Sequence, residues 1–178
     1  MEAYVIVRQI HTSEIDMVCK AIRDAFFLPK RSWRKPLYEM AYKGLISHKW
    51  TGIGLFTKQK DLIAYCDYKQ KNDTSIEIGI CLTIQKYRNH GYMQTLFQFL
   101  FNMYPEYSIR IGTYENNTAM IHCINRSGFQ EEQRIANDRI DGTSTIYYVR
   151  KGEVTGGTEH HYALHENNGS GECYSVVE

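Results

Sequence analysis

The chain has 178 residues, a formal net charge of +1, 43% hydrophobic residues and 23% charged residues. This balance is typical of one globular domain with a sizeable core, and it gives no reason to expect a nucleic acid or a membrane surface as a partner. Four of the five cysteines fall in apolar segments, which predicts buried free thiols in a reducing compartment. No zinc-ligand spacing is visible, so we expect no metal, and neither a signal peptide nor a bilayer-spanning run is visible, so we expect a cytoplasmic protein.

The periodicity of apolar residues changes several times along the chain. Alternating and β-branched runs predict strands, and apolar residues three or four positions apart predict helices, such as the stripe that includes Ile15, Val18, Ile22 and Phe26. Ser13 and Asp16 resemble a capping box at the start of that first helix. In chain order we expect a strand over 3–10, helices over 11–27 and 37–48, strands over 51–57, 62–68 and 75–84, a helix from 91 to about 105, a strand over 107–114, a helix over 115–128, and strands over 129–136 and 143–151.

This order, β-α-α-β-β-β-α-β-α-β-β, predicts an α+β domain with a mixed sheet over residues 1–151. Residues 152–178 are polar and rich in Gly, Asn, His and Glu, so we expect a flexible tail or arm. The loop 30–36, KRSWRKP, is either a solvated basic loop around one aromatic anchor or part of a site for an acidic acceptor. Three tail histidines without a scaffold are weak evidence for a metal.

The strand over 75–84 alternates strictly, which predicts two distinct faces. One face carries Ile76, Ile78, Ile80, Leu82 and Ile84, and the other carries Ser75, Glu77, Gly79, Cys81 and Thr83.

A glycine stands between this strand and the next helical stripe, in the run YRNHGYMQTLF. The first turn of a helix leaves N–H groups unpaired at its positive end, and a diphosphate satisfies both features. Gly91 permits close approach of the backbone to such a group, and Arg88 and His90 add donors. Read alone, the same run also fits a surface helix preceded by a loop glycine.

In residue type and spacing, the block 75–129 resembles the GNAT superfamily of acetyl-CoA-dependent N-acyltransferases. Arg88-Asn89-His90-Gly91-Tyr92-Met93 is similar to the family's pyrophosphate signature, with Met93 where a small residue is usual. Asn117, followed by Gly128-Phe129, is similar to its second signature. The resemblance implies a mostly antiparallel central sheet flanked by helices, with acetyl-CoA as co-substrate. The cofactor-binding residues it implies are Cys81, Leu82, Thr83, Arg88, Asn89, His90, Gly91, Tyr92, Met93 and Asn117.

The same resemblance implies a general base and leaves the general acid open. Glu77 occupies the place of a Glu that serves as base in the histone-acetylating branch, and burial between isoleucines would raise its pKa. A solvated strand glutamate is the alternative for Glu77. The family's usual tyrosine position holds Ile124, so Tyr114 is our candidate acid, and direct departure of the CoA thiolate is equally acceptable. Further candidate acids are Cys123, Tyr162 and Tyr174.

These observations predict an N-acetyltransferase that moves an acetyl group from acetyl-CoA directly to a primary amine in a ternary complex. A non-catalytic acyl-CoA-binding or sensing module with the same fold is the alternative, and a different α+β ligand-binding protein is a third. The identity of the amine stays open, because one fold carries many functions. A homodimer is possible.

Overall fold

The computed structural model describes residues 5–26, 37–139, 141–153 and 175–177. The basic loop 30–36 and the tail tyrosines and histidines lie outside this part of the chain. The helices are α1 (Ile15–Ala25), α2 (Leu37–Ile46), α3 (Tyr92–Met103) and α4 (Thr118–Arg126), with short 3₁₀ turns at Thr12–Glu14 and Gln85–Tyr87. The strands are β1 (Val5–Gln9), β2 (Thr51–Thr57), β3 (Leu62–Asn72), β4 (Ser75–Thr83), β5 (Ser108–Tyr114), β6 (Gln130–Ile135), β7 (Thr145–Arg150) and β8 (Ser175–Val177).

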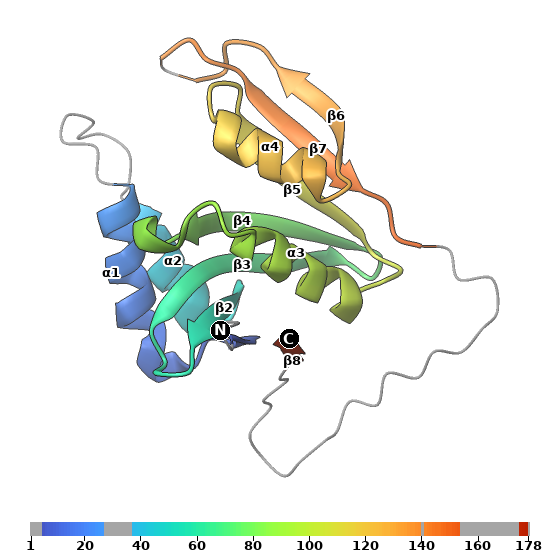
Figure 1. The fold of residues 1–178 in the computed structure, drawn as a ribbon. Helices are drawn as coiled ribbons and strands as arrows, with labels where there is room; N and C mark the ends of the chain where they lie inside the picture. The colour runs from blue at the N-terminus through green and yellow to red at the C-terminus, as the bar shows by residue number, and fades with distance from the viewer. Residues whose placement is uncertain (1–4, 27–36, 140, 154–174, 178) are drawn as a thin grey trace.

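These strands form one mixed sheet in the order β6-β7-β5-β4-β3-β2-β1-β8, with helices on both faces (Figure 1). Every neighbouring pair is antiparallel except β4 and β5, which are parallel. The predicted fold class is therefore confirmed, and β1 to β7 and α1 to α4 follow the predicted order. None of the helices in the described ranges is long and apolar enough to span a membrane.

The two faces of the sheet bury separate cores. On one face, apolar residues of α3 and Ile124 of α4 pack against the strands; on the other, α1 and α2 pack around Phe56, Tyr65 and Leu82. The predicted stripe of the first helix is buried at Ile15, Val18, Cys19 and Ile22, whereas Phe26 at its end is exposed. The buried stripe thus spans about two turns of helix, and its last predicted residue, Phe26, lies at the surface.

Local details of the chain differ from prediction at three places. Glu14, rather than Asp16, makes the capping bond, because its carboxylate accepts the backbone N–H of His11 at 3.0 Å. Strand β3 continues to Asn72, four residues beyond the predicted end of that strand at residue 68. Of the predicted tail, residues 175–177 form β8, which pairs with β1 at the edge of the sheet.

Strand β4 contains a bulge that sequence alternation does not reveal. Cys66 of β3 pairs with Cys81 and Tyr68 pairs with Ile78, so Asp67 alone lies opposite both Gly79 and Ile80. An extra residue in one strand reverses the faces of everything beyond it. The prediction that Ile76 through Ile84 share one face is therefore wrong. Ile76, Ile78 and Cys81 belong to the core under α3, and Ile80, Leu82 and Ile84 belong to the core under α1 and α2.

Candidate functional site

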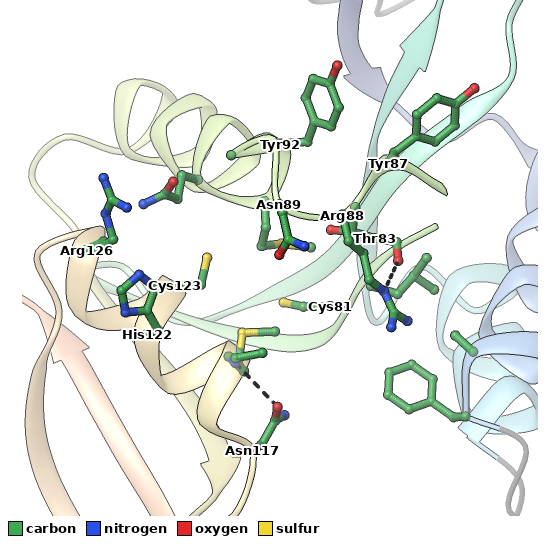
Figure 2. A pocket seen from close by; sticks show the side chains of 18 residues that line it. Cys81, Thr83, Tyr87, Arg88, Asn89, Tyr92, Asn117, His122, Cys123 and Arg126 are labelled. Carbon is green, nitrogen blue, oxygen red and sulfur yellow. Dashed lines mark hydrogen bonds between the residues drawn. The ribbon is translucent and has the colours of Figure 1, made fainter. Parts of the chain in front are cut away.

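A cavity of roughly 540 Å³ lies where β4 ends and α3 begins (Figure 2). Its walls come from the end of α1, the end of β4, the loop before α3, the first turn of α3 and one side of α4. The lining residues are Ala25, Phe26, Cys81, Leu82, Thr83, Tyr87, Arg88, Asn89, Gly91, Tyr92, Met93, Gln94, Asn117, Ala119, Met120, His122, Cys123 and Arg126.

The cavity coincides with an opening in the sheet. Strands β4 and β5 pair only from Ser75 with Ser108 to Ile78 with Ile111, and they diverge from the bulge onward. The opening between the two strands therefore begins after Ile78, well before β4 ends at Thr83. Because the cavity is lined by Phe26 from the α1 side and by Cys123 from the α4 side, it can be approached from both faces of the sheet.

The edge of β4 presents backbone groups to this opening. The N–H of Ile84 bonds the carbonyl of Ile63 on β3 at 2.9 Å. Because successive peptide groups of a strand point to opposite sides, the backbone of Thr83 and Cys81 faces the opening instead. Arg88 supports this direction, since its Nε donates to the Thr83 carbonyl at 3.2 Å. The Cys81 and Thr83 N–H groups are therefore available to an extended, amide-containing ligand.

The start of α3 forms the polar end of the cavity. Gly91 is the N-cap residue, with φ +78° and no side-chain capping bond. The first helical bond runs from the Thr95 N–H to the Gly91 carbonyl at 3.1 Å, so the N–H groups of Tyr92, Met93 and Gln94 have no partner within the helix. Unpaired N–H groups at a helix start suit a phosphate ligand, and the phosphate site itself stays a prediction.

Charge also suits an anionic ligand. Arg88 at one end and Arg126 at the other line the cavity, and no Asp or Glu is among its described lining residues. Arg88 was expected from the sequence, whereas Arg126 was not. Helical spacing could have identified Arg126 from the sequence. The residues of α4 that line the cavity are three or four positions apart and share one side of the helix: Ala119, His122, Cys123 and Arg126.

Most of the predicted cofactor-binding residues meet in this cavity. Only His90 is absent from its lining; its ring lies beside Tyr92 with ring centroids 5.8 Å apart. Met93, whose bulk departs from the usual signature, is buried in the core under α3. Asn117 caps α4, with Oδ1 accepting the Met120 N–H at 3.4 Å and Nδ2 donating to Thr113 Oγ1 at 3.1 Å.

The predicted catalytic residues lie outside the cavity lining. Glu77 is on the face covered by α1 and α2, where its carboxylate contacts Lys69 Nζ and Lys71 Nζ, each at 3.1 Å. Partial burial raises the pKa of Glu77, but the two lysines outweigh burial and hold that pKa below its usual range. The expectation of a raised pKa is therefore wrong. Tyr114 ends β5 with the Arg139 guanidinium 3.7 Å from the centre of its ring.

Two thiols reach the cavity in their protonated form. The hydrogen bond with Cys66, together with burial, raises the pKa of Cys81, and burial raises the pKa of Cys123. Thiols of this kind are weak nucleophiles, which fits our interpretation of direct transfer rather than a covalent intermediate. Ile124 is fully buried in the core. In the described part of the chain, no three His, Cys, Asp or Glu side chains gather as a metal site.

Comparisons with known proteins agree with this architecture. A family model described as the acetyltransferase (GNAT) family matches residues 15–129. A dodecameric spermidine N-acetyltransferase from Vibrio cholerae is 15% identical with a TM-score of 0.64, covering 83% of this chain and 93% of that one. RimL, a ribosomal L7/L12 α-N-protein acetyltransferase solved with coenzyme A, is 14% identical with a TM-score of 0.68, covering 85% of this chain and 96% of that one. A search of curated protein sequences gave no match. The family match spans well over half of the sequence, so the chain belongs to the GNAT acetyltransferase family and is an acyltransferase.

Proposed function

We propose that the protein transfers the acetyl group of acetyl-CoA to a primary amine within a ternary complex. The observation that carries this proposal is one continuous cavity that joins the unpaired N–H groups at the start of α3 to the opening between β4 and β5. The first feature suits a diphosphate, and the second suits an extended chain that contains amides. Acetyl-CoA has both parts in this order.

Different groups of the chain bind different parts of acetyl-CoA. The first-turn N–H groups of α3 and the Arg88 guanidinium hold the diphosphate. The Cys81 and Thr83 backbone pairs with the pantetheine arm, and an outward N–H of this edge polarises the thioester carbonyl. The amine approaches from the face of the sheet that α1 and α2 cover, where Phe26 lines the cavity.

Two chemically different amines should be tested first as acetyl acceptors. Similar structures carry names that specify spermidine and a protein α-amino group. We therefore propose spermidine and a short peptide with a free N-terminus as the first amines, with acetylation followed by mass spectrometry. Glu77→Gln tests whether the carboxylate expected from the sequence takes part in turnover.

Binding is tested separately by calorimetry with acetyl-CoA. Gly91→Glu places bulk and negative charge on the diphosphate site, so we expect binding to be abolished. Gly142→Glu is the matched control, because Gly142 has a similar φ of +76° with nothing within 4 Å of an added Cβ. Failure of the wild-type protein to bind acetyl-CoA at millimolar concentration would refute the proposal. Binding without acetylation of either amine would leave only a binding function.

A further inference from the structure

Arg126 lies in the last turn of α4 and lines the cavity. Every other arginine in the described ranges has a partner, which is a carboxylate, a hydroxyl, a backbone carbonyl or an aromatic ring. Arg126 is exposed, and within those ranges its guanidinium forms no hydrogen bond, ion pair or ring contact. Its N–H donors are therefore available to a ligand in the cavity.

The two arginines of the cavity are far apart. Figure 2 shows Arg126 on one side of the cavity and Arg88 with Thr83 on the opposite side. Arg88 is held at the β4 edge, because its Nε donates to the Thr83 carbonyl at 3.2 Å. The cavity therefore has two separate cationic ends, and the β4 edge accounts for only one of them.

A second donor lies beside Arg126. His122 precedes it by four residues on α4, so both side chains lie on one side of the helix, and both line the cavity. Among the described lining residues there is no Asp or Glu that could pair with them. A guanidinium next to an imidazole, without a carboxylate, is suited to an anion that has several acceptor oxygens.

The two faces of the sheet fix the direction of the proposed donor. Helix α3 and Ile124 of α4 pack on one face, and α1 and α2 pack on the other. In the proposed complex the diphosphate lies at the first turn of α3, and the pantetheine arm leads through the opening between β4 and β5 towards Phe26. The nucleotide end of the donor therefore stays on the face of α3 and α4, where Arg126 lies.

The nucleotide end of acetyl-CoA carries one more anionic group besides the diphosphate. This group is a phosphate monoester on the 3′ oxygen of the ribose. A phosphate monoester carries a charge of about −1.5 to −2 near neutral pH and has three acceptor oxygens. The diphosphate already has the first-turn N–H groups of α3 and Arg88. Arg126 and His122 thus provide the donors that a monoester on this side of the cavity requires.

We propose that Arg126, together with His122, binds the 3′-phosphate of the donor and makes the protein select acetyl-CoA over acetyl-3′-dephospho-CoA. This inference rests on the proposed acetyl transfer and names the part of the donor that α4 recognises. The 3′-phosphate is remote from the thioester and does not change during the reaction. The two side chains therefore determine specificity for the donor: they lower its KM and leave kcat unchanged.

The test compares the affinities of two donors, acetyl-CoA and acetyl-3′-dephospho-CoA, by calorimetry. Wild type should bind acetyl-CoA about tenfold more tightly, because charge-assisted hydrogen bonds to the monoester are lost with the second donor. Arg126→Gln should bind acetyl-CoA about tenfold more weakly than wild type does, and its affinity for the second donor should stay within about twofold. His122→Gln should show the same selective loss to a smaller extent.

Two reference variants separate this effect from general changes in charge. Arg23→Gln is the matched control, because Arg23 is an exposed arginine in the last turn of α1 and lies outside the cavity lining. Its affinity for both donors should equal that of wild type. Arg88→Ala should weaken both donors by the same factor, since the diphosphate is present in each. With spermidine as acceptor, Arg126→Gln should raise the KM for acetyl-CoA about tenfold and leave kcat within about twofold.

Several results would overturn the assignment. Equal affinity of wild type for the two donors refutes it without any variant. If Arg126→Gln weakens both donors equally, or lowers kcat and leaves KM unchanged, Arg126 does not read the 3′-phosphate. If circular dichroism shows that Arg126→Gln has lost its helices, Arg126→Lys replaces it. This variant keeps the charge but loses the paired hydrogen bonds, so an unchanged preference between the donors refutes the inference.

Failure of the inference can be distinguished from failure of the proposed function. A wild-type protein that binds neither donor contradicts the proposed function itself. A wild-type protein that binds and uses both donors equally keeps that function and contradicts only the role of Arg126 and His122.

Discussion

Replacing Asp67 with asparagine should stabilise the protein at neutral pH. The pKa of this carboxyl is raised from 3.8 to about 6 because burial disfavours its charged form. A difference of about 2 in pKa corresponds to roughly 3 kcal/mol between the protonated and ionised forms, at 1.36 kcal/mol each. Asparagine is neutral and keeps the hydrogen bonds with the Ile80 N–H and the Tyr65 hydroxyl. The variant should therefore avoid most of the roughly 3 kcal/mol cost of burying the charged carboxylate.

The sign of the pH dependence follows from proton linkage. Between pH 3.8 and about 6 the folded protein holds the Asp67 proton while the unfolded chain has lost it. The stability contributed by protonated Asp67 is therefore complete below pH 3.8 and is lost as the pH rises through about 6. The gain from Asp67→Asn should be close to zero at pH 4 and about 3 kcal/mol at pH 8.

Urea denaturation followed by circular dichroism at both pH values measures this difference. For a chain of this length, 3 kcal/mol corresponds to a rise in Tm of roughly 6–12 °C. Asp73→Asn, the same chemical change at an exposed turn residue, should change stability by less than about 0.5 kcal/mol at either pH. A variant that is destabilised at pH 8, or equally stabilised at both values, would refute the interpretation of Asp67 as an ionised buried group.

Three further substitutions test the site and the core. Arg88→Ala should raise the Kd for acetyl-CoA about tenfold, because a charge-assisted bond contributes about 1.5 kcal/mol; unchanged calorimetric affinity would exclude Arg88 from the diphosphate site. Gly79→Ala should lower the free energy of unfolding by about 1–3 kcal/mol, because the added methyl group collides with Asp67 and Trp50. A melting curve that matches wild type would contradict this crowding around Gly79. Leu96→Ala removes a fully buried side chain of α3 and should cost about 2–5 kcal/mol in urea denaturation; a cost below 1 kcal/mol would show that the core closes around the gap.

The order of elements was predictable because it depends on local periodicity. The helical stripe after Gly91 and the β-branched runs before it are set by residues that are close in sequence, and the structure follows both. The approximate position of the ligand cavity followed from the same region. A single glycine directly before a helical pattern of apolar residues can be recognised in a sequence.

The bulge and its carboxylate were not predictable in this way. Strict alternation over 75–84 gives no sign that Gly79 and Ile80 share one partner, because the extra residue is defined only by pairing with β3. Asp67 sits in the apolar run LIAYCDY, where a lone acidic residue suggests the end of a strand. Phe26 and Arg126 reach the cavity through tertiary packing of α1 and α4, which is a property of the folded chain and not of local spacing.

The short parallel ladder between β4 and β5 has a mechanical consequence. In the described sheet, residues 75–78 and 108–111 provide the direct strand pairing between a three-stranded part, β5 to β7, and the strands on the other side. Such a seam bends more readily than a fully bonded sheet, and a ligand lodged in it contacts both parts at once. A bound ligand should therefore reduce the relative motion of the two parts of the sheet. Slower amide exchange in β5 on ligand binding would show this effect at a distance from the diphosphate.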